Sequence, residues 1–137
     1  YVIAGNHNDL SYPAADQTQA ALRYFKKLRE LQPKAVIVVF GVNPLQGESS
    51  DSGAVRNAEL NLKAAFDQWA DGNAYFVPIA TDPNGPWITG TGSVDAPKGD
   101  GNKDLFYTSK DGHPLQRGVD YFAQRYAQAL KNIFAGK

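Results

Sequence analysis

Two short polar segments, far apart in the sequence, carry the side chains best suited to chemistry. Residues 5–9, Gly-Asn-His-Asn-Asp, follow an apolar run at the start of the sequence, and residues 111–114, Asp-Gly-His-Pro, precede a helical pattern. The Asn8 amide can donate to an oxyanion, and His113, with Asp111 near it, can act as a general base. These groups are two of the three parts of an acyl-transfer site. The third part, an activated nucleophile, is not evident.

The elements that must position these groups alternate between strand-like and helical patterns. Apolar runs predict strands at 1–4, 35–40 and 74–79, and helical spacing predicts helices over about 13–32, through 55–69 and over about 114–134. This order implies a parallel sheet with right-handed crossovers. Active sites in such sheets lie at the carboxyl ends of the strands. Asn8, which comes just after the first strand, is therefore expected at that edge.

Apolar spacing also predicts which helix faces are buried. Pro33 is expected to end the first helix, Asp51 or Ser52 to cap the second, and Pro78 to place the third strand at a sheet edge or to end it. The predicted buried positions are Ala21, Tyr24, Phe25, Leu28 and Leu31; then Val55, Ala58, Leu62, Ala65, Phe66 and Trp69; and finally Val119, Phe122, Tyr126, Leu130 and Ile133.

Length and composition are those of one globular domain. The 137 residues hold 14 basic and 14 acidic side chains, so no electrostatic field points to nucleic acid or an anionic membrane as a partner. The absence of Cys rules out a disulfide framework and a thiolate metal site. No apolar run approaches the roughly 20 residues that span a bilayer. Residues 81–109, with five glycines and three prolines, form a long irregular stretch of the kind that often carries function.

The first residues predict a strand that needs a neighbour. Residues 1–4 are apolar and would leave an exposed edge, which invites aggregation. We therefore expect another polypeptide segment, or a symmetry partner, to complete the sheet.

The two polar segments resemble sequence blocks of the SGNH (GDSL-type) hydrolases. Residues 5–9 are similar to the third block, Gly-x-Asn-Asp, and residues 110–114, followed by Gly118, are similar to the fifth, Asp-x-x-His-Pro. The glycine-rich stretches 89–92 and 99–102, which precede Tyr107, resemble relatives in phage tail and polysaccharide-modifying proteins. The resemblance covers essentially the whole chain and matches the C-terminal part of the family domain.

The resemblance implies a fold and an activity. Residues 1–137 would be the C-terminal part of one domain, a three-layer α/β sandwich with a parallel, flavodoxin-like sheet whose N-terminal strands lie outside this chain. The activity would be that of a serine esterase that removes O-acetyl or similar groups from a carbohydrate, in an extracellular or virion-associated protein. Asn8 would donate to the oxyanion, His113 would be the general base, and Asp111 would orient it. The nucleophilic Ser would come from an upstream segment, so the isolated chain should be inactive; no cofactor or metal is expected.

Some residues depart from the family pattern. One residue separates Asp111 from His113, where the family has two, so a backbone carbonyl, another acid such as Asp104, or no third group could take the place of Asp111. Asn6 stands where Gly is usual. The long loops carry Trp87 and Tyr107, which could stack on a sugar or pin a loop. All six serines lie in polar turns and none fits a nucleophile elbow: Ser11, Ser49, Ser50, Ser52, Ser93 and Ser109.

Two other functions compete with the esterase. Gly-Asn-His at 5–7 also resembles a block of the binuclear metallophosphoesterases, but that chemistry needs several more ligands and the chain has only one other His. A non-catalytic carbohydrate-binding or structural domain would explain the short spacing between Asp111 and His113. The presence of both Asn8 and His113 counts against that alternative.

Overall fold

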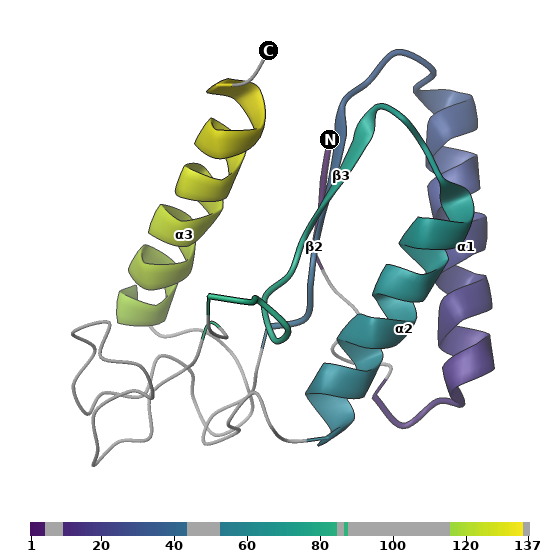
Figure 1. Ribbon diagram of the computed structural model, residues 1–137, viewed down its shortest axis with the longest axis horizontal. Helices are drawn as coiled ribbons and strands as arrows, with labels where there is room; N and C mark the ends of the chain where they lie inside the picture. The colour runs from purple at the N-terminus through teal and green to yellow at the C-terminus, as the bar shows by residue number, and fades with distance from the viewer. Residues whose placement is uncertain (5–9, 44–52, 85–86, 88–115, 136–137) are drawn as a thin grey trace. The chain divides into compact units, whose positions relative to one another are not determined.

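The computed structural model describes residues 1–4, 10–43, 53–84, 87 and 116–135. Within these ranges the chain is α/β, with three helices and a three-stranded parallel sheet (Figure 1). It divides into two compact units, residues 1–43 with 50–86, and residues 44–49 with 87–137. The order of elements is β1 (Val2–Ile3), α1 (Ala14–Leu31), β2 (Ile37–Phe40), α2 (Gly53–Trp69), β3 (Ala74–Val77) and α3 (Gln116–Ala135).

The sheet belongs to the first unit and has the strand order β1-β2-β3. Val2 pairs with Val38, and Val38 in turn pairs with Tyr75, so β2 is the central strand. All four residues of β2 are buried, which confirms the prediction of a strand covered on both faces. Among the described residues β3 pairs only with β2, and it ends one residue before Pro78. The prediction that Pro78 places the third strand at a sheet edge or ends it is confirmed for the end of the strand.

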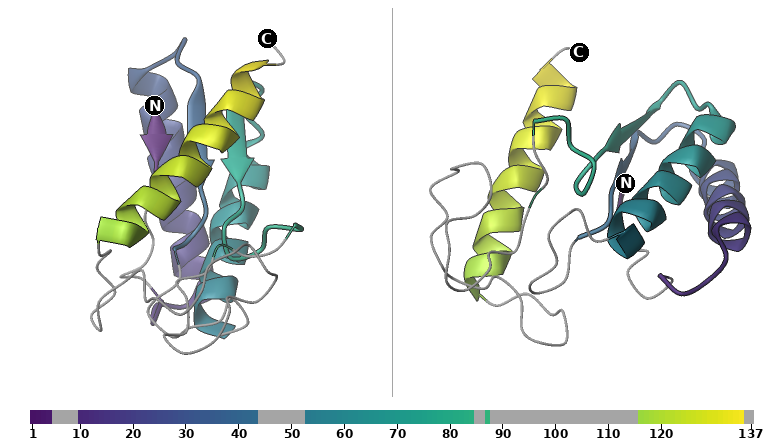
Figure 2. Two further views of the ribbon diagram at one scale, coloured as in Figure 1. Left: turned by 90° about the vertical axis from the view of Figure 1, so that its left-hand side faces the viewer. Right: turned by 60° about the horizontal axis from the view of Figure 1, so that its bottom comes forward.

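Helices α1 and α2 cover the same face of the sheet (Figures 1 and 2). This follows from two successive right-handed crossovers that advance in the same direction, from β1 to β2 and from β2 to β3. Helix α1 ends at Leu31, where the Gln32 amide still donates to the Leu28 carbonyl at 2.9 Å and Pro33 prevents continuation. The predicted end of the first helix is confirmed. Residues 51–52, the predicted cap of α2, lie outside the described residues.

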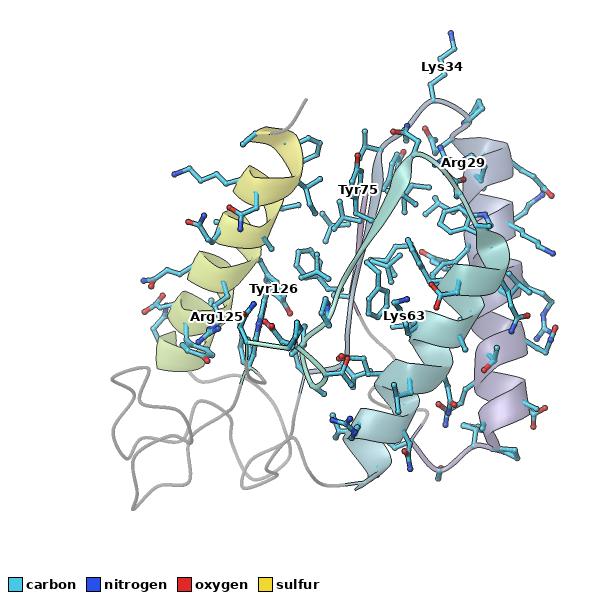
Figure 3. All side chains as sticks on the ribbon, viewed as in Figure 1. Arg29, Lys34, Lys63, Tyr75, Arg125 and Tyr126 are labelled. Atoms are coloured by element: carbon cyan, nitrogen blue, oxygen red, sulfur yellow. The ribbon has the colours of Figure 1, made fainter. Side chains whose placement is uncertain are left out.

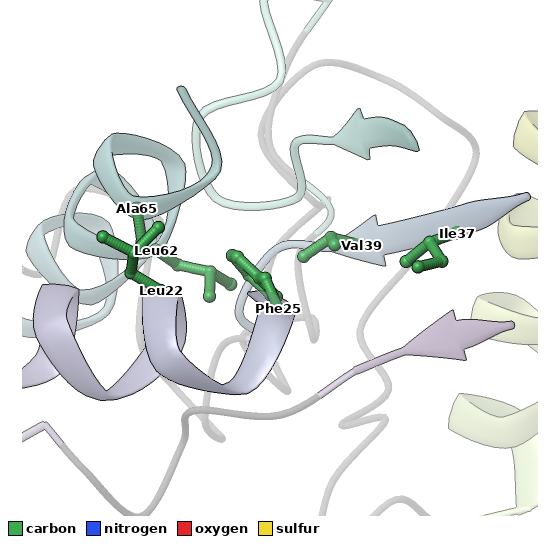
Figure 4. Packing of buried hydrophobic residues seen from close by; sticks show 6 residues of the cluster. All are labelled: Leu22, Phe25, Ile37, Val39, Leu62 and Ala65. Atoms are coloured by element: carbon green, nitrogen blue, oxygen red, sulfur yellow. The ribbon is translucent and has the colours of Figure 1, made fainter. Parts of the chain in front are cut away.

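The core between these helices and the sheet is aromatic and aliphatic. Figure 4 shows six of its residues converging from α1, α2 and β2: Leu22, Phe25, Ile37, Val39, Leu62 and Ala65. Phe25 stacks on Trp69 with ring centroids 5.2 Å apart, and the rings of Phe66 and Phe76 are 5.6 Å apart. The predicted buried face of α2 is confirmed at Val55, Ala58, Leu62 and Ala65.

Three predicted core positions are wrong. Tyr24 and Leu31 in α1 are 55% and 63% exposed, because the buried face of this helix runs through Gln17, Leu22 and Phe25. A helix turns by about 100° per residue, so Tyr24 lies to one side of Phe25. Val119 in the first turn of α3 is 45% exposed.

The second unit contributes α3, which begins at Gln116. Along it the rings of Tyr121 and Phe122 are 5.3 Å apart, and those of Phe122 and Tyr126 are 6.3 Å apart. Residues 114–115, where the sequence predicts that the helix starts, lie outside the described residues. Among the described helices none is both long and apolar enough to cross a membrane.

An arginine at the end of α1 ties the amino ends of β2 and β3 together (Figure 3). Arg29 makes a two-pronged ion pair with Asp71, with N–O distances of 2.6 and 2.9 Å, and donates to the carbonyl of Ala35 at 2.7 Å. Asp71 also accepts from the Asn73 amide at 2.8 Å. The Arg29 hydrogen bond, more than the Asn73 amide, lowers the pKa of Asp71 below its ordinary value of 3.8, against the opposing effect of desolvation.

This ion pair predicts a pH-dependent stability. Replacement of Asp71 by Asn should lower the free energy of unfolding by about 2 kcal/mol at neutral pH, since the pair is mostly buried. Because folding lowers the pKa of Asp71, its contribution is fully present above pH 3.8 and is lost as the pH falls through the lower folded-state pKa. Urea denaturation of the wild type and of Asp71→Asn, at pH 7 and at pH 3, measures the free energy of unfolding under both conditions. The exposed pair Lys63–Asp67 supplies the control: Asp67→Asn should cost less than about 0.5 kcal/mol, and an equal loss for both variants would contradict the assignment.

Candidate functional site

Most of the residues that the sequence predicts for the site fall outside the described part of the chain. Asn8, Asp111, His113 and Tyr107 all do, as do Asn6 and Asp104. Their roles stay predictions. Trp87 is described, and so is Ser11, which lies in an exposed turn as predicted. The structure does describe residues that flank the two polar segments.

The segment 5–9 is anchored on both sides in the first unit. Before it, Ile3 packs against the core cluster between the sheet and the two helices. After it, Leu10 packs against a second cluster, formed by Val42, Val55, Ala58 and Ala80. Val42 follows β2 and Ala80 follows β3, so this second cluster lies at the carboxyl ends of the strands. The chain that leaves β1 thus returns to the edge of the sheet where sites of this fold class form.

A buried carboxylate accepts hydrogen bonds from the backbone at this edge of the sheet. Glu59, in the middle of α2, is 0% exposed and accepts hydrogen bonds on both of its oxygens. Oε2 accepts from the amides of Val42 at 2.9 Å and Ala80 at 2.8 Å, and Oε1 accepts from the Thr81 amide at 2.8 Å and its hydroxyl at 2.6 Å. The Ile79 amide lies 3.1 Å from both oxygens. One side chain therefore fixes the backbone that follows β2 and β3.

Gly41 makes room for this carboxylate. A Cβ at this position would overlap Oε2 of Glu59 and would lie 2.9 Å from the Ile79 amide nitrogen. Only glycine therefore lets the end of β2 approach α2 so closely. The Gly41 amide also donates to the Val77 carbonyl at 2.8 Å, which carries the pairing of β2 and β3 one residue further.

The surroundings of Glu59 define what it can do. Each oxygen accepts several hydrogen bonds, and no part of the residue is exposed, so the carboxylate has no contact with solvent. It is suited to holding the backbone and not to acid–base catalysis. In the described ranges no group of three or more His, Cys, Asp or Glu side chains could hold a metal ion.

A groove opens beside β1 in the first unit. It has a volume of about 570 Å³ and is lined by Ile3 and by side chains of α1 and the turn before it, among them Tyr12, Asp16 and Tyr24. The adjoining strand residue Val2 is 58% exposed. Among the described residues β1 pairs only with β2, so its other edge is open.

Trp87, predicted to stack on a sugar or to pin its loop, contacts α3 within the second unit. Its ring centroid lies 5.4 Å from that of Tyr126, and the Arg125 guanidinium is 5.6 Å from the Trp87 ring and 4.8 Å from the Tyr121 ring. Arg125 and Tyr126 are labelled on α3 in Figure 3. These contacts attach Trp87 to the helix. Stacking of Trp87 or Tyr107 on a sugar stays a prediction.

Comparison with known proteins does not assign the chain to a family. No protein-family model, no curated protein and no solved structure matches it.

The sequence carries one signal for the role of Glu59 that the motifs above do not include. Glu59 occupies a position on the apolar face of α2, four residues after Val55 and three before Leu62. A charged residue on such a face is buried only when it is paired or fully hydrogen-bonded. The partners could not be foreseen, because they are backbone amides from the ends of two strands.

Proposed function

We propose that this chain is part of a serine esterase of the SGNH type that removes O-acetyl or similar ester groups from a carbohydrate. The observation that carries the proposal is the packing of Leu10, two residues after Asn8, on the cluster at the carboxyl ends of β2 and β3. This supports a place for the Asn8 amide at the edge of the parallel sheet where catalytic groups of such folds gather. The start of α3 at Gln116, two residues after the end of the Asp-Gly-His-Pro segment, supports a second catalytic group close to the beginning of a helix.

The proposed reaction needs a nucleophile from a segment outside these 137 residues. A Ser hydroxyl there attacks the ester carbonyl carbon while His113 accepts the hydroxyl proton, and the Asn8 amide donates to the oxyanion that forms. Collapse of this intermediate breaks the bond to the sugar oxygen, which takes the proton from His113 and leaves as a hydroxyl group. Water then attacks the acyl-enzyme with His113 again as base, and acetate and the free Ser are released. Asp111, or another acceptor such as Asp104, would orient His113.

The open edge of β1 supports a further segment of this kind. Tyr1 and Val2 are 59% and 58% exposed, and unpaired apolar strands of this sort promote unwanted association. A neighbouring strand would pair with β1, and its connection would cover the groove next to α1 that Tyr12 and Tyr24 line. With such a segment the α/β fold extends to the three-layer sandwich of the SGNH hydrolases.

A pair of asparagines in the segment 5–9 tests the role of Asn8. In the complete protein, Asn8→Ala should lower kcat for p-nitrophenyl acetate by about 100- to 1,000-fold, because an oxyanion donor acts only on the transition state. The matched control Asn6→Ala should change kcat by no more than about twofold. Equal losses for the two variants, or an unchanged rate for Asn8→Ala, would refute the assignment of Asn8.

A further inference from the structure

We infer that backbone amides at the ends of β2 and β3 form an anion-binding nest, that the carboxylate of Glu59 occupies it, and that this internal ligand makes the two strand ends open together. Concavities in which backbone N–H groups converge bind anions in many proteins. Here the anion is a side chain of α2, so the ligand and its site belong to one chain. All of these residues lie in the described part of the chain, and the inference does not depend on the proposed esterase.

Backbone donors from two strands converge on this carboxylate. The consecutive amides of Ile79, Ala80 and Thr81, which follow β3, lie 2.8 to 3.1 Å from its oxygens. The Val42 amide reaches it from the end of β2 at 2.9 Å. These four N–H groups, the nest amides, can only donate hydrogen bonds, whereas a carboxylate only accepts them. The site therefore suits an anion better than a neutral group of the same shape.

The fold makes room for the carboxylate and excludes water from it. Glu59 is 0% exposed, and a charged side chain is costly to bury unless hydrogen bonds replace those that it makes to water. Gly41 leaves the space that the group occupies, because a Cβ at this position would overlap Oε2. Removal of the carboxylate would therefore leave a cavity that is lined by amide donors and has the shape of the missing anion.

One oxygen atom joins the two strand ends. Oε2 accepts from Val42, after β2, and from Ala80, after β3, at 2.9 and 2.8 Å. When the carboxylate moves away, both amides lose their acceptor at once, and a buried N–H without an acceptor is strongly unfavourable. The two segments therefore open together. Because ligands of parallel α/β sheets bind at this edge, an event at one segment is passed on to the other.

Refilling the nest with a free anion tests its chemistry. The atoms that Glu59→Ala removes correspond to one acetate ion, whose methyl carbon takes the place of Cγ. We expect the nest amides of this variant, in the complete protein, to exchange hydrogen about 100-fold faster than in the wild type. Sodium acetate at about 100 mM should slow their exchange by about tenfold, which corresponds to a dissociation constant of about 10 mM. Acetamide, which is neutral, and sodium chloride at the same concentration should not slow it.

Leu62→Ala is the matched control for a cavity without a nest. Leu62 lies about one turn further along α2, is 6% exposed and packs in the apolar core cluster, so its truncation also leaves a buried cavity. Acetate should leave hydrogen exchange in Leu62→Ala unchanged, because an apolar cavity offers no donor to an anion. Equal slowing by acetate in both variants, or no slowing in Glu59→Ala, would overturn the nest.

Two variants of Thr81 test the coupled opening, and they decide the matter also if Glu59→Ala does not fold. The Thr81 hydroxyl donates to Oε1 at 2.6 Å; Thr81→Val removes this donor and Thr81→Ser keeps it. We expect Thr81→Val to speed exchange of the Val42 amide, on the other strand, by about fivefold and Thr81→Ser to change it by less than about twofold. The faster exchange should depend little on urea, because a local opening exposes little surface. An unchanged Val42 amide, or one whose exchange shows the urea dependence of global unfolding, would overturn the coupling.

Discussion

Replacement of His113 by alanine in the complete protein is expected to lower kcat for ester hydrolysis by about four orders of magnitude or more. Loss of the general base of a Ser–His pair leaves only substrate binding and oxyanion stabilisation to catalyse the reaction. KM should change little, because the imidazole acts in the transition state. The measurement is steady-state hydrolysis of p-nitrophenyl acetate, with circular dichroism to establish that the variant is folded. Activity within about tenfold of wild type would exclude His113 as the base.

The only other histidine of the chain supplies a matched control. His7→Ala should keep kcat within about twofold if the site is an SGNH esterase. In a binuclear metallophosphoesterase, by contrast, the Gly-Asn-His segment would bind metal, and His7→Ala would abolish hydrolysis of phosphate esters. The pair of variants therefore separates the two enzyme classes in one set of assays.

Gly41→Ala is expected to lower the free energy of unfolding by roughly 4 kcal/mol. The new methyl group would overlap Glu59 Oε2 and press on the Ile79 amide, which is backbone and cannot rotate away. Overpacking of a rigid site costs about 1–3 kcal/mol. Displacement of the carboxylate adds the cost of buried amides left without an acceptor, about 1–3 kcal/mol each. Urea denaturation followed by tryptophan fluorescence measures the change.

Alanine substitutions at two other glycines test whether the loss of stability is specific to Gly41. A Cβ at Gly72 meets nothing within 4 Å, and one at Gly53, the first residue of α2, meets only the Asn57 side chain at 3.9 Å. Gly72→Ala should be neutral, and Gly53→Ala should be neutral or stabilising by up to about 1 kcal/mol. A loss at Gly41 no larger than at these positions would contradict the packing of Glu59 against the end of β2.

Much of the fold follows from the sequence through local rules. The all-apolar residues 35–40 contain the central strand β2, because only a strand covered on both faces tolerates such a run. Pro33 and Pro78 mark where α1 and β3 stop, since proline lacks the amide proton that helix and sheet both need. The β-α-β-α-β order predicts a parallel sheet with right-handed crossovers. That both crossover helices lie on one face depends on the strand order β1-β2-β3, which the sequence does not reveal.

What the sequence did not predict depends on contacts between distant residues. Tyr24 and Phe25 are neighbouring aromatic residues, and the packing of α1 against α2 and the sheet decides that Phe25 is buried and Tyr24 is exposed. Glu59 has the composition of a surface residue. It is buried because amides from the ends of β2 and β3, 17 to 22 residues away along the chain, converge on it. Such convergence leaves no periodic signal in the sequence.

The catalytic residues are predicted from the sequence, and the structure adds packing and hydrogen bonds of residues near one of the two polar segments. Asn8 and His113 are predicted from their chemistry and from the resemblance of their segments to SGNH sequence blocks. The structure adds the anchor residues Ile3 and Leu10, and the carboxylate of Glu59 beneath the strand ends.

Labelling with a fluorophosphonate, read by intact mass and then by peptide mapping, tests the central claim most directly. The complete protein should take up one label, on a Ser outside the 137 residues, and His113→Ala should slow the labelling by orders of magnitude because the hydroxyl then lacks its base. A label on Ser11 or on any other Ser of this chain would contradict the proposed origin of the nucleophile. A folded, complete protein that takes up no label would contradict the esterase itself.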